Sequence, residues 1–165
     1  AALDAVEENI ALIGMPGAGK TCVGAELARL LGRRHVDIDA ELERALGTSC
    51  ADYITAHGED AFRIEETAVL GRVAARSALV ISCGGGVVAR PENYGLLHQN
   101  ARIVMLDRPL DELSSKGRPV SQRDGIAALA ERRLPLYRAW ADAVVASRAT
   151  PAATAQSVRD ALSDI

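Results

Sequence analysis

A short apolar segment, Ile10–Ile13, runs directly into the glycine-rich stretch Gly14–Thr21. That stretch has the pattern G-x-x-x-x-G-K-T, which is typical of a phosphate-binding loop (P-loop) between a strand and a helix. Its glycines permit the tight backbone turn that directs successive N–H groups at phosphate oxygens. We therefore expect a bound nucleoside triphosphate, with its phosphates held by Gly17, Ala18, Gly19, Lys20, Thr21 and Cys22.

Two side chains of this loop carry expected roles of their own. Lys20 places a cation near the β- and γ-phosphates, and the Thr21 hydroxyl is the expected ligand of Mg²⁺. The helix that follows directs the positive end of its dipole at the same anion. The alternative, a glycine-rich turn with no ligand, explains neither the lysine nor the threonine.

The 165 residues fit a single domain, Ala1–Ile165, in which residues 1–8 form an extension or linker. A net charge of −3 argues against a general nucleic-acid or acidic membrane surface. No apolar run approaches the roughly 18 residues that span a bilayer. The N-terminus has no signal-peptide pattern, and the cysteines, Cys22, Cys50 and Cys83, have no metal-binding spacing, so we expect a cytoplasmic protein.

Helical and strand patterns alternate along the chain, which predicts an α/β fold with a parallel sheet. The expected strands are Asn9–Ile13, His35–Ile38, Ala78–Ser82, Arg102–Leu106 and Asp142–Val145. The expected helices are Thr21–Leu31, Ala40–Ala45, Ala51–Ala56, Asp60–Ala74, Pro91–Leu97, Gly125–Trp140 and Ala152–Leu162. The polar, basic segment Ser114–Gly125 is short of apolar anchors and is a candidate lid; a solvated loop is the alternative.

Asp37 and Asp39 stand where the second strand is expected to end. On a strand both would point to one face, near the P-loop if their strand lies beside it. Such a pair can serve Mg²⁺ and a substrate hydroxyl together. The alternative is that Asp39 caps the following helix.

Further along, the triple glycine Gly84–Gly86 follows the third strand, a place where glycines serve close backbone approach. Arg63 and Arg138 are candidates for bidentate pairing with a carboxylate.

Taken in order, these elements resemble the shikimate kinases, small members of the nucleoside-monophosphate-kinase-like P-loop family. The resemblance rests on the P-loop, Asp37-x-Asp39, Phe62-Arg63-x-x-Glu66, Gly84–Gly86, and Arg118-Pro119 followed by Leu136-Tyr137-Arg138. It implies a five-stranded parallel sheet of order 2-3-1-4-5 with a mobile lid and a shikimate-binding helical region. It also implies ATP and shikimate as substrates, Mg²⁺ as cofactor, and transfer of phosphate to the shikimate 3-hydroxyl in aromatic amino acid biosynthesis.

The resemblance also implies roles for individual residues. Asp39 would hold the ring hydroxyls of shikimate and help to accept the proton, while Asp37 would support the metal through water. The shikimate carboxylate would lie between Arg63 and Arg138, with Glu66 orienting Arg63 and the amides around Gly85 completing the pocket, formed by Gly84, Gly85 and Gly86. Lys20 and Arg118, the latter carried by the lid, would meet the ATP phosphates.

The chain departs from the family in its lid, which is several residues shorter. Ser114 and Ser115 stand where relatives carry arginines that stack on adenine, so Arg123 and Arg148 become candidate replacements. Other functions stay open at this stage: another small P-loop kinase acting on a nucleoside monophosphate or gluconate, and a P-loop module without an acceptor. We expect a monomer, or one domain of a longer fused enzyme.

Overall fold

The computed structural model describes residues 7–113 and 120–164, with strands and helices alternating along most of the chain. All five described strands are parallel and lie in one sheet of order β2-β3-β1-β4-β5, which confirms the predicted topology. Their bounds are β1 Asn9–Ile13, β2 Arg34–Asp37, β3 Leu79–Ser82, β4 Ala101–Asp107 and β5 Ala143–Ala146. Strands β1 and β3 are buried along their whole length, as expected for strands covered on both faces.

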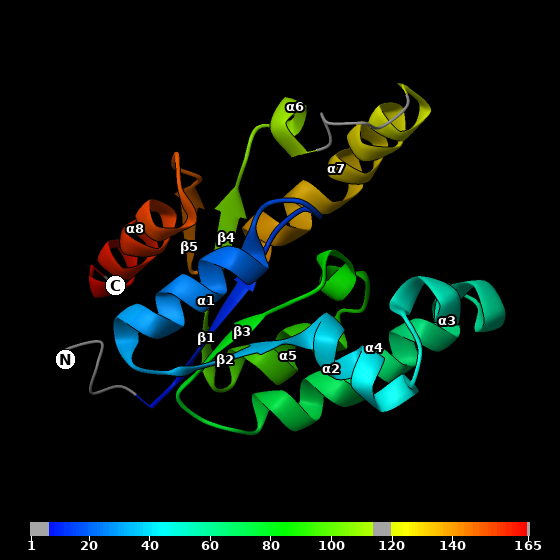
Figure 1. Ribbon diagram of the computed structural model, residues 1–165, viewed down its shortest axis with the longest axis horizontal. Coiled ribbons are helices and arrows are strands. Elements are labelled where there is room, and N and C mark those ends of the chain that lie inside the picture. Colours follow the sequence, from blue (N-terminus) through cyan, green and yellow to red (C-terminus); the bar gives the residue numbers. More distant parts are fainter. Residues whose placement is uncertain (1–6, 114–119, 165) are drawn as a thin grey trace.

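Helices cover both faces of this sheet (Figure 1). Helix α1 (Lys20–Leu31) packs beside α8 (Pro151–Ser163) on one face, while α4 (Glu59–Ala74) packs against α5 (Glu92–His98) on the other. The remaining helices are α2 (Ile38–Leu46), α3 (Cys50–His57), α6 (Leu110–Leu113), α7 (Val120–Trp140) and the 3₁₀ helix η2 (Gly85–Ala89). Within the described ranges, no helix is both long and apolar enough to cross a membrane.

The order of the strands positions the site. The chain leaves β1 towards β2 on one side, and later returns past β1 to build β4 and β5 on the other. In open parallel sheets, ligands bind at the carboxyl ends of strands where the chain direction reverses in this way. The P-loop follows β1, the Asp37–Asp39 turn follows β2, and the triple glycine follows β3. All three therefore lie at the carboxyl edge of the sheet.

Three expectations about local structure need correction. Asp37 ends β2, but Asp39 lies in the first turn of α2, so the two acids do not share a strand face. Asp37, and not Asp39, caps α2: its Oδ1 accepts from the backbone N–H groups of Asp39 and Ala40 at 2.9 and 3.3 Å. A carboxylate in the N-cap position ends the strand because it satisfies donors that only a helix presents. Segments 85–89 and 110–113, where the sequence predicted no helix, are helical.

The candidate lid, Ser114–Gly125, falls only partly in the described chain. Residues 114–119, including Arg118, lie outside it, whereas Val120–Gly125 form the first turns of α7 rather than a loop. Helix α7 then continues through Pro135 to Trp140. A lid role for this segment stays a prediction.

Candidate active site

The P-loop joins β1 to α1 as its sequence predicted. Gly17 shows why glycine is needed: its φ is +84°, and a Cβ there would lie 2.6 Å from the carbonyl oxygen of Leu113. Helix α1 begins at Lys20 with no side-chain cap and no acidic residue in its first turn. Its first N–H groups and the positive end of its dipole are therefore available to an anion. Within the loop Ala18 is buried, and Cys22 is exposed in the first turn of the helix.

Lys20 is buried inside the loop, with 9% of the residue exposed. Its Nζ donates to the carbonyl oxygens of Gly14 and Met15 at 2.7 and 3.0 Å. Burial lowers the pKa of this ammonium group from 10.5 to about 8, and the Cys83 and Asp39 side chains act in the opposite direction. The lysine thus bonds to its own loop, beside the place where the phosphates of a nucleotide are expected.

Thr21 and Asp37 form a contact suited to a hard divalent cation. The Thr21 hydroxyl donates to Oδ2 of Asp37 at 2.6 Å, which leaves the lone pairs of Oγ1 free to bind a metal. Because Asp37 also caps α2 through Oδ1, its carboxylate is fixed in place. Hydroxyl and carboxylate oxygens, supplemented by water and phosphate, are the ligands that Mg²⁺ prefers. A site with these two protein ligands suits a metal that is shared with a phosphate. Among the side chains that the structure describes, no group of three or more His, Cys, Asp or Glu is placed to hold a metal ion.

Asp39 lines a pocket of about 200 Å³, here called the Asp39 pocket, next to the P-loop. Burial raises the pKa of Asp39, and the neighbouring charge of Asp37 adds to the shift. A Cβ on Gly84 would lie only 2.9 Å from Oδ1 of Asp39, so this glycine is what allows the carboxylate to approach the backbone. The pocket is lined by Pro16, Asp39, Cys50, Phe62, Arg63, Glu66, Gly84, Gly85, Gly86 and Arg133.

Arg63 projects from α4 into this pocket between two carboxylates. Its Nη1 donates to Glu66 at 3.0 Å and its Nη2 to Glu59 at 3.2 Å. Glu66 is 1% exposed; burial raises its pKa, and the guanidinium opposes that shift. The Nε of Arg63 is buried and has no hydrogen-bond partner among the described residues. A buried donor without a partner is costly, so a ligand that accepts from this Nε would be stabilised here.

The structure does not bring Arg138 into the site. Arg138 is exposed on α7, whereas Arg133 on the same helix lines the Asp39 pocket and lies within reach of Gly85. The inner face of α7 is marked by buried residues at a helical spacing: Ile126, Ala130, Tyr137 and Trp140. Arg133 stands one turn before Tyr137 on that face, whereas Arg138 is rotated by about 100° around the helix axis from Tyr137.

Sequence reasoning missed Arg133 because it followed the Tyr137-Arg138 pair instead of the apolar period of α7, which could have identified the inward arginine. The same face anchors the helix to the triple glycine, since the hydroxyl of Tyr137 donates to the carbonyl oxygen of Gly85.

A second pocket, of about 130 Å³, opens beside the P-loop between the ends of β4 and β5. We call it the Arg108 pocket; it is lined by Ala18, Gly19, Val23, Arg108, Ser147, Arg148, Ala149, Thr150, Pro151 and Thr154. Arg108 is anchored there, with Nη1 donating to the Gly17 carbonyl at 3.3 Å and Nε near Glu112 at 3.5 Å. The side chain of Arg148 instead donates to Ser157 on α8 at 3.3 Å. Among the described arginines, Arg108 therefore offers this pocket a cation bound to the P-loop itself.

Comparisons with known proteins agree with this geometry. The family model for shikimate kinase matches residues 16–163. A shikimate kinase from Synechococcus sp. (strain CC9605) is 38% identical over 160 residues, covering 91% of this chain and 80% of the relative. One from Nitrosomonas europaea is 38% identical over 148 residues, covering 84% of this chain and 70% of the relative.

Solved structures give the same result. The shikimate kinase from Acinetobacter baumannii in complex with shikimate superposes with a TM-score of 0.91 at 31% identity, covering 99% of this chain and 96% of that one. A gluconokinase from Sinorhizobium meliloti reaches a TM-score of 0.65 at 16% identity, with 96% and 93% coverage, which shows a shared fold alone. The matches in family model, sequence and structure establish that the chain belongs to the shikimate kinase family.

Proposed function

We propose that this kinase transfers the γ-phosphate of ATP to the 3-hydroxyl of shikimate, giving shikimate 3-phosphate and ADP. The observation that carries the proposal is the Asp39 pocket, where the Asp39 carboxylate and two arginines, one of them paired with Glu66, converge beside the P-loop. That set of groups matches a small acceptor that bears hydroxyls and a carboxylate. The Acinetobacter relative, described in complex with shikimate, supports the same acceptor.

The acceptor carboxylate lies between Arg63 and Arg133 in this proposal. The unpartnered Nε of Arg63 is the donor that the carboxylate would satisfy, and a guanidinium suits its planar shape. Glu66, itself almost fully buried, holds Arg63 from behind at 3.0 Å. Amides of Gly84, Gly85 and Gly86 complete the wall of the pocket. Arg133 thus takes the role that the sequence had assigned to Arg138.

Asp39 orients the reacting hydroxyl and helps to accept its proton. Its raised pKa, caused first by burial, brings the carboxylate closer to the range in which a base works near neutral pH. The hydroxyl it holds faces the P-loop, where Lys20 and the first amides of α1 neutralise the phosphates. Phosphoryl transfer depends mainly on such positioning and charge stabilisation.

Thr21, directly, and Asp37, through water, would hold Mg²⁺; when bound, it would supply positive charge to the phosphate oxygens of ATP. We further propose that Arg118, outside the described residues, approaches the same phosphates from the lid. The Arg108 pocket, which Ala18 and Gly19 of the P-loop help to line, would take the adenine base. We place the reaction in the cytoplasm, in aromatic amino acid biosynthesis, with the chain acting as a monomer or as part of a fused enzyme.

The test is an acceptor panel with ATP and Mg²⁺: shikimate, gluconate and a nucleoside monophosphate, with ADP release followed in a coupled assay. Among the three acceptors, we expect only shikimate to support turnover. The Asp39→Asn variant should lose that turnover but still bind ATP, as measured by calorimetry. Faster turnover with gluconate or the nucleotide would contradict the proposed acceptor. If Asp39→Asn abolished ATP binding while acceptor binding survived, Asp39 would belong to the metal instead.

A further inference from the structure

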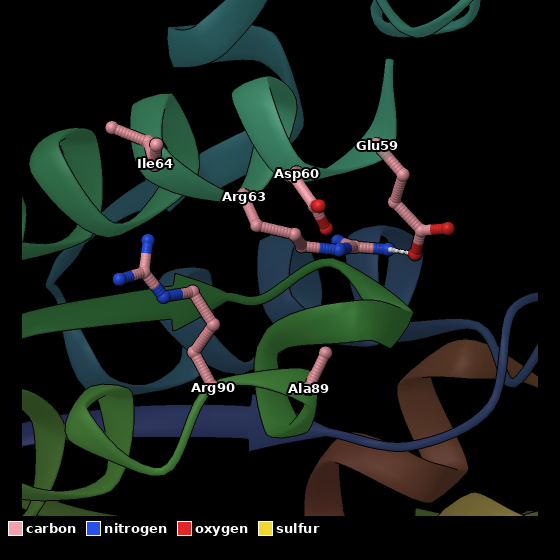
Figure 2. Close-up of a pocket in the computed structure, with 6 residues that line it drawn as sticks. All are labelled: Glu59, Asp60, Arg63, Ile64, Ala89 and Arg90. Atoms are coloured by element: carbon pink, nitrogen blue, oxygen red, sulfur yellow. Dashed lines mark hydrogen bonds and ion pairs between the residues drawn. The ribbon is translucent and has the colours of Figure 1, made fainter.

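A separate pocket of about 350 Å³ lies between the first turns of α4 and the end of η2. It is lined by Glu59, Asp60, Arg63, Ile64, Ala89 and Arg90 (Figure 2), and we call it the Arg90 pocket. Arg63 is the one lining residue that it shares with the Asp39 pocket. The nucleotide and acceptor sites proposed above use no other part of it, so the pocket has no assigned role in phosphoryl transfer.

The charged groups around this pocket are only partly paired. Arg63 is committed to Glu66 and to one oxygen of Glu59. Arg90 uses Nη2 to bind Glu92 at 2.8 Å. In the described part of the chain, no hydrogen bond engages Nε or Nη1 of Arg90, the second oxygen of Glu59, or the Asp60 carboxylate. The pocket therefore offers free donors and free acceptors at once.

These free groups are separated in space. In Figure 2 the guanidinium of Arg90 rises towards α4 on the Ile64 side, whereas the carboxylates of Asp60 and Glu59 lie on the other side. The side chain of Arg63 lies between these two sides (Figure 2). The lining also includes two exposed apolar side chains: Ile64, which is 59% exposed and lies on the Arg90 side, and Ala89. An isolated anion would meet two carboxylates here and an isolated cation two arginines, so neither suits the pocket as a whole. A zwitterion with an apolar body matches every part.

We propose that the Arg90 pocket binds an α-amino acid with an apolar side chain. The carboxylate of the amino acid accepts a charge-assisted hydrogen bond from Nη1 of Arg90, one of the guanidinium nitrogens that Glu92 leaves free. Its ammonium group donates to Asp60 and to the free oxygen of Glu59. Its side chain covers Ile64 and Ala89, removing apolar surface from water. The volume of the pocket falls within the range of about 300–1,000 Å³ typical of small-molecule sites, at the end that suits a small ligand.

The test is titration calorimetry of the whole chain with L-leucine and L-phenylalanine as probes. Shikimate is kept at saturation, after its own binding has been measured, so that the probe carboxylate cannot occupy the Asp39 pocket. We expect one binding event per chain for each probe. Arg90→Gln should weaken that binding roughly tenfold or more, because a charge-assisted pair is lost. Phosphorylation by this variant should match the parent, which also shows that it is folded.

Matched controls make the test specific. Arg44→Gln removes another surface arginine, paired with Glu41 at 2.9 Å, and should leave probe binding unchanged. Isopentylamine and 4-methylpentanoate, which are leucine without its carboxylate and without its ammonium group, should each bind more weakly than leucine. The proposal is overturned if neither probe binds, if shikimate displaces them, if Arg90→Gln binds like the parent, or if either analogue binds as well as leucine.

Discussion

Replacing Gly86 by alanine tests whether the position of Arg63 controls acceptor binding. A Cβ on residue 86 would lie 2.3 Å from Cζ, Nη1 and Nη2 of Arg63, so the guanidinium rests directly on this glycine. To regain an ordinary separation of 3.4 Å or more, the guanidinium must move by about 1 Å. The backbone φ of Gly86 lies outside the left-handed region, so the contact alone opposes alanine.

A displacement of about 1 Å in a positioning group can cost about 100-fold in rate, or about 2.7 kcal/mol. We therefore expect Gly86→Ala to lower kcat/KM for shikimate by about that factor, while KM for ATP and the melting temperature change little. Gly71→Ala is the matched control on the helix that carries Arg63, since its Cβ would meet only Leu96 Cδ1, at 3.9 Å. A Gly86→Ala enzyme with kcat/KM for shikimate within threefold of the parent would refute the reasoning.

Other expectations follow from the same geometry. Arg133→Lys should weaken shikimate binding by about 2–3 kcal/mol, whereas Arg138→Lys should leave it unchanged; calorimetry that finds the reverse order would restore Arg138 to the site. Lys20→Ala should lower kcat by on the order of 10²–10³ in a folded enzyme, as measured by steady-state turnover. Because the pKa of Lys20 is about 8 without nucleotide, kcat/KM for ATP should fall as the pH rises through that value, when the free enzyme loses the cation; a flat profile between pH 7 and 9.5 would exclude this control. Arg108→Ala should lower kcat/KM for ATP and for GTP alike, because a guanidinium that stacks on a base does not distinguish between purines. A parent enzyme that prefers ATP over GTP more than a hundredfold would contradict this role.

Much of the fold could be predicted because its signals are local and redundant. The P-loop fixed the strand–turn–helix unit from β1 to α1, and apolar runs marked the strands to within one residue at each end. The Asp37–Asp39 turn was harder to predict, because either carboxylate could cap the following helix. The strand ends at the residue that serves as the cap, and the sequence did not show which of the two it is. The observed cap, Asp37, also accepts from the Thr21 hydroxyl, a contact between distant parts of the chain that a local pattern does not reveal.

The acceptor side of the site could be predicted only in part. Arg63 and the triple glycine were found because residue type and spacing suffice, but their direct contact depends on how α4 docks on η2. Arg133 was missed even though its position on the inner face of α7 is written in the spacing of buried residues. Arg108 has no local signal at all: an arginine after a strand is ordinary, and its importance comes from the Gly17 carbonyl, far away in sequence.

The bonds of Lys20 to the carbonyl oxygens of Gly14 and Met15 have a consequence for the release of product. When ADP departs, a buried ammonium group would be left without a counter-charge, and that vacancy would hold the product back. The carbonyl oxygens of Gly14 and Met15 would accept from this ammonium group as the phosphates withdraw. Nucleotide release would then exchange one set of oxygen acceptors for another, without leaving a buried donor unpaired.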